Sequence, residues 1–313
     1  MNVLIMERGS HIDPVAVQAD CPGLKVTYAK TRAEAEQVCS EAEILVAMAH
    51  EVEDSLLSRM PHLRYICALT SGVEHFDGLK ALRGDIIITN GRGIHGPQMS
   101  ELAFLYMIAL SRDFKRMQVN QANGIWDRWP QQLIYKKTVT IIGIGTIAED
   151  LGLRCQAFGM QVIGVSDART SARGFDEIMP RQKLNDAAAR ADFLVVLVPL
   201  SASTHHMIDA SVLDAMKKTG IVINLARGAV VDQKALTERL VENRLGGAGL
   251  DVFETEPVPK DDPLWSLPNV IMTPRIGGMS DVYAQQIHPL VVHNLNAFAK
   301  GDIAQMQNIC RGN

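Results

Sequence analysis

The sequence predicts an α/β protein made of two Rossmann-like domains, each with a doubly wound parallel sheet. Three observations support this fold class. Short apolar runs alternate with polar, helix-forming stretches in both halves of the chain. In the second half, a glycine-rich turn follows directly after one such run. The chain has 313 residues, of which 47% are hydrophobic and 21% are charged, so it can fill two hydrophobic cores.

The first part of the chain, up to residue 98, shows the alternation that is typical of βαβ units. Polar stretches at 31–40 and 52–60 predict helices between buried strands. The strands are expected at four apolar runs, which are residues 3–6, 44–47, 65–68 and 86–88.

A long amphipathic segment follows and predicts a single helix from Ser100 to Asn120. A final helix is expected from Ser280 to Lys300, with Ser280 as its N-cap and a bend at Pro289. Between these helices the sequence predicts six strands, mostly separated by helical segments, at residues 138–142, 161–165, 193–198, 221–225, 249–252 and 270–273.

This order of elements predicts that one domain is inserted in the other. Residues 1–98 and 282–313 are expected to form a substrate domain, and residues 99–281 a dinucleotide-binding domain. The crossings near Ser100 and Ser280 would then be hinges beside a cleft.

The composition argues against several classes of protein. A formal net charge of -4 disfavours a nucleic-acid-binding protein, which usually has a basic excess. No apolar run reaches the ~18 residues of a membrane span, and the run at 3–6 is too short for a secretory signal. The five cysteines are scattered and never spaced as CxxC, which indicates reduced thiols. We therefore expect a cytoplasmic protein without a membrane or nucleic-acid partner.

The glycine-rich turn has the pattern GxGxxA and runs through Gly143, Gly145, Thr146, Ile147 and Ala148. Gly143 permits a tight strand-to-helix turn, Gly145 lets the backbone approach a pyrophosphate, and Ala148 lets the helix pack closely. The amino-terminal end of the helix offers N–H groups to phosphates. Because the pattern lies between a predicted strand and a predicted helix, it predicts a dinucleotide site; a tight turn without a ligand is the alternative.

The residue that reads the adenine ribose is expected at the end of the next strand. Asp167 lies 22 residues after Gly145, and an acidic side chain there favours NAD. Arg169 and Arg173 follow closely and would favour NADP. The sequence therefore predicts NAD, with NADP or an ordinary solvated loop as alternatives.

Five motifs, in this order, resemble those of the D-isomer-specific 2-hydroxyacid dehydrogenases, and the resemblance covers nearly the whole chain. It implies hydride transfer between NAD or NADP and a small anionic 2-keto or 2-hydroxy acid, and it implies a homodimer. The motifs are the glycine turn at 143–148, Pro199-Leu200 with Thr204, and the segments 224–228, 249–257 and 273–278.

The resemblance also assigns roles to single residues. The arginine that matches Arg227 binds the substrate carboxylate in the family, and the planar donor fork of a guanidinium suits this task. The aspartate that matches Asp251 contacts the nicotinamide, and Pro199 belongs to a loop beside the cofactor. In the first domain, the segment Ser71-Gly72-Val73 matches a turn whose backbone amides bind the carboxylate; a plain glycine turn is the alternative.

The chain departs from the family at the proton relay, which is a glutamate paired with a histidine. Glu256 matches the glutamate, but Arg275 stands where the histidine is expected. A histidine near pKa 6.5 exchanges a proton readily, whereas an arginine with a pKa above about 12 does not. Three roles are open for Arg275: it pairs with Glu256, it stabilises a developing alkoxide, or it binds a second anionic group beside Arg227. The alternative function is a nucleotide-sensing or interaction protein without turnover.

Several histidines are candidates for the missing acid. His95 is the first candidate, because it lies in the segment of the substrate domain that is expected to face the cleft. His75 and His288 are the next candidates. His205 and His206 lie near the expected cofactor site but lack the carboxylate spacing of a metal site, so we expect no metal.

Overall fold

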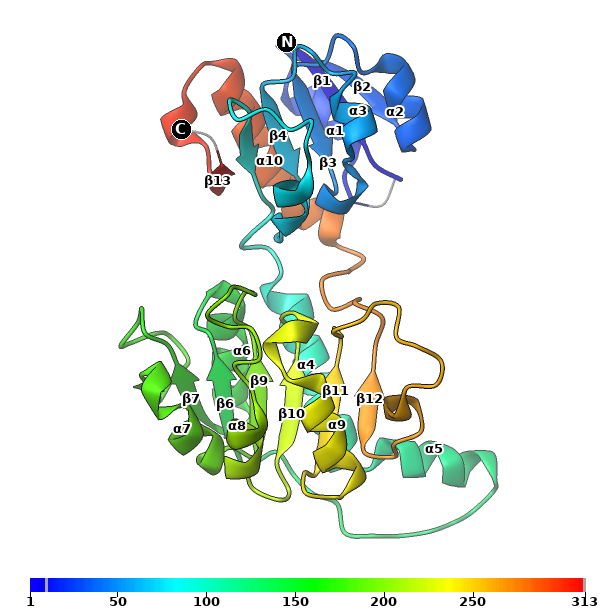
Figure 1. Cartoon of the computed structure of the whole chain (residues 1–313), viewed down its shortest axis with the longest axis vertical. Helices are drawn as coiled ribbons and strands as arrows, with labels where there is room; N and C mark the ends of the chain where they lie inside the picture. The colour runs from blue at the N-terminus through cyan, green and yellow to red at the C-terminus, as the bar shows by residue number, and fades with distance from the viewer. Residues whose placement is uncertain (9–10, 312–313) are drawn as a thin grey trace. The chain divides into compact units, whose positions relative to one another are not determined.

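The computed structural model describes residues 1–8 and 11–311, which fold into two compact units (Figure 1). Unit 1 comprises Met1–Ile94 and Ser280–Asn313, and unit 2 comprises His95–Met279. Residues 312 and 313, which end the expected substrate domain, lie outside the described residues. Each unit has its own sheet and its own hydrophobic cores, so the predicted α/β class with two parallel-dominated sheets is confirmed.

Unit 1 contains a sheet with the strand order β13-β5-β4-β3-β1-β2. Its strands are parallel except β13, which pairs antiparallel with β5 at one edge. The strands are β1 (Asn2–Met6), β2 (Lys25–Ala29), β3 (Ile44–Ala47), β4 (Tyr65–Ala68), β5 (Ile87–Thr89) and β13 (Ile309–Arg311).

Helices cover both faces of this sheet, because the buried side chains of each strand alternate between two cores. Leu4, Leu45 and Ile66 belong to one core, and their neighbours Ile5 and Tyr65 belong to the other. The helices are α1 (Pro14–Asp20), α2 (Arg32–Val38), α3 (Asp54–Leu57) and α10 (Tyr283–Ala299).

Unit 2 contains an entirely parallel sheet with the strand order β12-β11-β10-β9-β6-β7-β8. Parallel strands end at the same edge of a sheet, so the segments that follow them are brought together. The strands are β6 (Thr138–Ile142), β7 (Gln161–Val165), β8 (Glu177–Met179), β9 (Phe193–Val196), β10 (Ile221–Asn224), β11 (Gly247–Leu250) and β12 (Val270–Met272). The helices are α4 (Gly96–Ser111), α5 (Phe114–Ala122), α6 (Thr146–Ala157), α7 (Leu184–Arg190), α8 (Ala210–Ala215) and α9 (Gln233–Val241).

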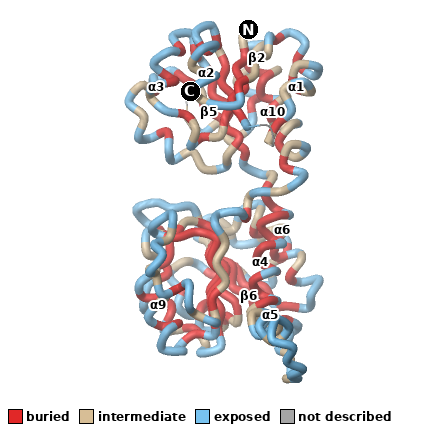
Figure 2. The backbone as a smooth tube through the Cα atoms, turned by 90° about the vertical axis from the view of Figure 1, so that its right-hand side faces the viewer, coloured by how far each residue is buried: buried red, intermediate tan, exposed pale blue. Residues whose placement is uncertain are grey.

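The prediction of one helix from Ser100 to Asn120 is wrong. The chain forms two helices, α4 and α5, because Asp113 between them has the left-handed backbone conformation with φ +54°. The second helix has no buried residue, and Figure 2 shows it as an exposed segment.

The prediction that Ser280 caps the last helix is also wrong. The Ser280 carbonyl accepts a hydrogen bond from the Tyr283 amide, so a turn precedes the helix, and α10 begins only after Val282. Pro289 lies inside this helix, as expected.

Three strands, β2, β8 and β13, were not predicted from the sequence. Each is an edge strand, in which side chains are partly exposed and a continuous apolar run is not required. Within the described ranges, no helix has both the length and the apolar character to cross a membrane.

Candidate functional site

The glycine turn between β6 and α6 has the geometry that the sequence predicts. Gly143 has φ +92°, and a Cβ atom on it would lie 2.6 Å from Val198 Cγ1. Gly145 precedes the first turn of α6, and a Cβ atom on it would meet nothing within 4 Å. Ala148 is buried against the sheet. The turn is therefore closed toward the protein at Gly143 and open at Gly145, beside the amino-terminal end of α6.

The segment after β7 contains the residues that bear on the choice of cofactor. Asp167 is exposed, and its Oδ1 accepts a hydrogen bond of 2.9 Å from the Arg181 amide. Arg169 donates to Glu149 on α6 at 2.8 Å, so its charge already has a carboxylate partner. Arg173 is exposed.

The loop after β9 is fastened by a threonine. Thr204 Oγ1 donates to the Pro199 carbonyl and accepts from the Ser201 amide, both at 2.7 Å. In the same loop the rings of His205 and His206 are stacked with centroids 4.0 Å apart, and His206 Nε2 lies 2.8 Å from a carboxylate oxygen of Glu254. Among the described residues, no group of three or more His, Cys, Asp or Glu side chains forms a metal-binding arrangement.

Arg227 follows β10, and a buried asparagine shapes its turn. Asn224 accepts from the Ala226 amide at 3.1 Å and donates to the Arg227 carbonyl at 3.0 Å. A Cβ atom on Gly228 would lie 1.9 Å from the carbonyl carbon of Phe253. The turn at Arg227 is thus in direct backbone contact with the segment that follows β11, and this contact requires a glycine.

Asp251, at the end of β11, fastens the segment that follows β12. It is buried, and it accepts hydrogen bonds of 2.9 Å from the amides of Ile276 and Gly277. Thr273 donates to the same carboxylate, and the Tyr106 hydroxyl on α4 is hydrogen-bonded to Thr273. Burial raises the pKa of Tyr106 well above its ordinary value, so this hydroxyl stays protonated. No motif in the sequence indicated the support from Tyr106.

Arg275 lies on the turn that Asp251 fastens, with φ +58°. Its Nη1 donates to Glu256 Oε2 at 2.8 Å, while Glu256 Oε1 accepts from the Phe253 amide at 3.1 Å. The expected pairing of Arg275 with Glu256 is therefore confirmed. The Arg275 side chain is still 55% exposed, so the guanidinium remains accessible from solvent.

His95 lies beside this turn. It directly precedes α4 and is 9% exposed, and a Cβ atom on Gly278 would lie 3.3 Å from its Cδ2. Burial lowers the pKa of the imidazole below its ordinary value of 6.5, so His95 is neutral at pH 7.

The other two candidate histidines have structural partners within unit 1. His75 Nε2 lies 2.7 Å from the Val52 carbonyl, and His288 Nε2 lies 2.7 Å from Asp20 Oδ2.

Ser71, Gly72 and Val73 follow β4 in unit 1, whereas the other predicted site residues lie in unit 2. Thr70 Oγ1 donates to the Gly72 carbonyl at 2.7 Å, which closes the turn. Within residues 1–8 and 11–311, the backbone N–H groups of Gly72 and Val73 find no hydrogen-bond acceptor. The turn therefore presents two donors to a ligand.

Comparison with known proteins places these features in a wider group. Residues 104–277 match the family described as D-isomer specific 2-hydroxyacid dehydrogenase, NAD binding domain. A glyoxylate reductase from Pyrococcus horikoshii is 33% identical over 84% of this chain and 81% of its own length.

Two further relatives cover more of the chain. A D-3-phosphoglycerate dehydrogenase from Methanocaldococcus jannaschii is 30% identical over 94% of this chain, which spans only 57% of that protein's length. The crystal structure of a D-isomer specific 2-hydroxyacid dehydrogenase family protein from Aeromonas salmonicida has a TM-score of 0.90 at 32% identity and covers 98% of both chains.

Proposed function

Since this chain belongs to the D-isomer specific 2-hydroxyacid dehydrogenase family, we propose that it transfers a hydride between NAD(P) and C2 of a small anionic 2-keto or 2-hydroxy acid. One observation carries the proposal. The parallel sheet of unit 2 presents the open glycine turn and Arg227 at the same edge, because β6 and β10 both end there. This common position supports a dinucleotide site with a carboxylate-binding residue beside it.

Backbone groups of the glycine turn hold the cofactor. The amides near Gly143, Gly145, Thr146 and Ile147, together with the positive end of α6, bind the pyrophosphate. Pro199 lines the cofactor site from the loop that Thr204 fastens. When bound, NAD(P) supplies or accepts the hydride.

We propose NAD as the preferred cofactor. The exposed carboxylate of Asp167 suits the 2′-hydroxyl of NAD and repels the 2′-phosphate of NADP. Arg169 is compensated by Glu149, which weakens the argument for NADP. We expect Asp167→Ala to raise the KM for NADH and to leave the KM for the keto acid unchanged.

Two elements are assigned to substrate binding. In unit 2, Arg227 holds a carboxylate through its guanidinium, and in unit 1 the turn at Ser71, Gly72 and Val73 offers backbone donors to an anionic group. His95 contributes a neutral imidazole on the substrate side. Asp251 is assigned to the cofactor site, and its carboxylate also fixes the segment after β12.

The proton relay differs from that of the family. The Arg275–Glu256 pair stabilises negative charge on the substrate oxygen, and the proton comes from water or from a residue other than Arg275.

The test is a spectrophotometric assay of NADH and NADPH with glyoxylate, hydroxypyruvate, pyruvate and dicarboxylic keto acids. We expect oxidation of NADH with at least one of them, and a loss of kcat/KM of roughly 100-fold in Arg227→Gln, because two charge-assisted hydrogen bonds are removed. Arg190→Gln is the matched control, since Arg190 pairs with Glu177 at the edge of the same unit. An enzyme that is inactive with every acid contradicts the proposal.

A second candidate function rests on Arg275 alone. A nucleotide-sensing protein on this fold would bind NAD without turnover. It would be recognised by thermal stabilisation with NADH in the absence of activity towards any keto acid.

Two further properties belong to the proposal. We infer a homodimer in solution, because exposed apolar side chains gather on α4, α5 and the segment after them; these are Leu105, Ile108, Phe114, Val119, Ile125, Trp126, Leu133 and Tyr135. We also propose a cytoplasmic location, since all five cysteines, each within the described ranges, are thiols without a disulfide.

A further inference from the structure

Three asparagine side chains connect the C-terminal segment of unit 1 to the turn at Ser71. They are Asn90, Asn294 and Asn308, and we call them the asparagine ladder. Each side chain bonds to the backbone of a segment that is distant in sequence from it. An asparagine amide carries a donor and an acceptor, so it can pair with a peptide group as another peptide would.

Asn90 is the part of the ladder that contacts the turn. Its Nδ2 donates to the Ser71 carbonyl at 2.8 Å, and its Oδ1 accepts from the Arg92 amide at 3.3 Å. The next amide, that of Gly91, donates to the Thr70 carbonyl at 2.8 Å. The segment 90–92 is therefore hydrogen-bonded to the backbone of Thr70 and Ser71, where the turn begins.

Asn308 fixes the position of the segment 90–92. Its Nδ2 donates to the carbonyls of Asn90 at 3.2 Å and Arg92 at 2.7 Å, and its own carbonyl accepts from the Asn90 amide at 3.2 Å. The residue has φ +58°, a left-handed conformation that asparagine tolerates better than most side chains. Beyond it, β13 pairs with β5 and fixes the segment on the sheet edge.

Asn294 anchors the C-terminal segment to α10. The side chain is fully buried, accepts from the Gln307 amide at 2.7 Å and donates to the Gln307 carbonyl at 3.0 Å. Gln307 precedes Asn308, so the ladder runs without a gap from a buried helix position to the Ser71 turn. A loss of its middle member would leave the Asn90 and Arg92 carbonyls without this donor.

We propose that Asn308, acting through Asn90, is a positioning residue for substrate binding: the C-terminal segment sets the conformation in which the Gly72 and Val73 amides meet an anionic substrate. This inference rests on the proposed function of the Ser71–Val73 turn. It also predicts a specific pattern in the kinetics, because a displaced donor weakens binding of the acid and leaves the cofactor site in unit 2 unchanged.

The test compares Asn308→Gly with the wild-type protein. Glycine keeps the left-handed backbone without strain and removes only the amide side chain. We expect the KM for the keto acid to rise roughly fivefold, as for the loss of one or two neutral hydrogen bonds. We expect kcat to stay within about twofold, since the bonds act on binding. The KM for NADH should not change.

The matched control is Asn243→Gly. Asn243 also has a left-handed backbone, with φ +54°, but it follows α9 in unit 2. This variant should leave the KM for the acid unchanged. An unchanged acid KM in folded Asn308→Gly, or an equal rise in both variants, overturns the inference.

A second measurement separates this inference from the proposed function. Amide hydrogen exchange at Gly91 and Arg92, whose amides donate to the Thr70 carbonyl and to Asn90 Oδ1, should become faster in Asn308→Gly and stay unchanged in Asn243→Gly, whether or not any keto acid is turned over. Faster exchange without turnover in the wild-type protein supports the ladder and contradicts the proposed reaction. Unchanged exchange at Gly91 and Arg92 overturns the ladder itself.

Discussion

At the scale of single residues, the proposed reaction depends on which group gives the proton to the keto acid, because Arg275 stands at the position where the resemblance implies a histidine. Arg275 is held by Glu256 and lies on a turn that Asp251 fixes from the end of β11. Arginine side chains in general stay charged at neutral pH, whereas a histidine exchanges a proton there.

The variant Arg275→His tests this difference. Histidine tolerates a left-handed backbone better than most residues, so it fits the φ of +58° at this position. A protonated imidazole donates to the ketone, so the rate of keto-acid reduction by this variant should fall as the pH rises through about 6.5. We expect kcat/KM of the wild-type protein to lack that fall between pH 6 and 8.

Arg275→Lys is the control for the pH profile, because a lysine ammonium keeps the positive charge and does not titrate in this range. A wild-type profile that falls with a midpoint below pH 6.5 would indicate a buried histidine as the acid, since burial lowers the pKa of His95, and His95→Gln would then show whether it is His95.

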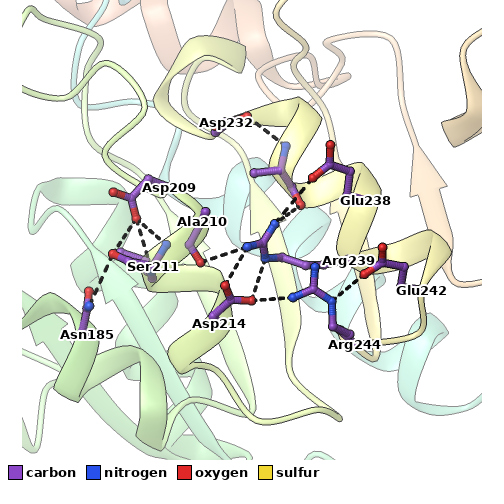
Figure 3. Close-up of polar contacts among 12 residues, drawn as sticks. Asn185, Asp209, Ala210, Ser211, Asp214, Asp232, Glu238, Arg239, Glu242 and Arg244 are labelled. Atoms are coloured by element: carbon purple, nitrogen blue, oxygen red, sulfur yellow. Dashed lines mark hydrogen bonds and ion pairs between the residues drawn. The ribbon is translucent and has the colours of Figure 1, made fainter.

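At the scale of elements, α8 and α9 are joined by ion pairs on the surface of unit 2 (Figure 3). Arg239 is 7% exposed and donates to both carboxylate oxygens of Asp214, at 2.9 and 2.7 Å. Arg244 donates to the same carboxylate at 2.9 Å. The hydrogen bonds from Arg239 hold the pKa of Asp214 below its usual range.

We predict that Asp214→Asn lowers the free energy of unfolding of unit 2 by about 1 kcal/mol, a modest loss because the aspartate is half exposed. The folded-state pKa is lowered, so this stabilisation is present above the usual carboxyl pKa of about 4 and disappears as the pH falls through the lowered value. Urea denaturation followed by tryptophan fluorescence measures it, since all three tryptophans lie in unit 2.

Arg244→Gln provides the comparison for Asp214→Asn. It removes the more exposed of the two arginines, so its effect should be smaller. A difference between wild type and Asp214→Asn that persists unchanged at pH 3 would contradict the assignment to this carboxylate.

Prediction from the sequence was most accurate for the elements that are buried on both faces. Strands β3, β4, β6 and β7 have the predicted bounds, because a parallel strand between helical layers is mostly apolar along its length. The edge strands carry no such requirement. The break at Asp113 was missed because neither a proline nor a glycine marks it.

The candidate site shows the same division between local and distant information. Residues at strand ends, such as Arg227 and Asp251, can be found from motif and order. The contacts that hold them come from positions far along the chain, such as Tyr106 on Thr273 and Asn308 on Arg92. The spacing of these residues in the sequence follows no period, so the contacts can be recognised only in the folded structure.

At the scale of the whole molecule, α5 and the segment after it pose a question of stability. The helix has nine residues and buries none of them, although an isolated helix of fewer than about 12 residues is marginal in water. Trp126 is 94% exposed, and Phe114 and Val119 are also exposed. Covering these side chains with the same surface of a second copy would bury them symmetrically.

We therefore predict that light scattering after size exclusion gives twice the 34.3 kDa mass of one chain at micromolar concentration. Trp126→Ser combined with Val119→Ser should shift the mass toward 34.3 kDa, because the interface loses apolar area. Val241→Ser is the control, since Val241 is 52% exposed and lies at the end of α9. A wild-type protein with the mass of one chain would contradict the dimer. A double variant that stays dimeric would show that the dimer does not form through α5.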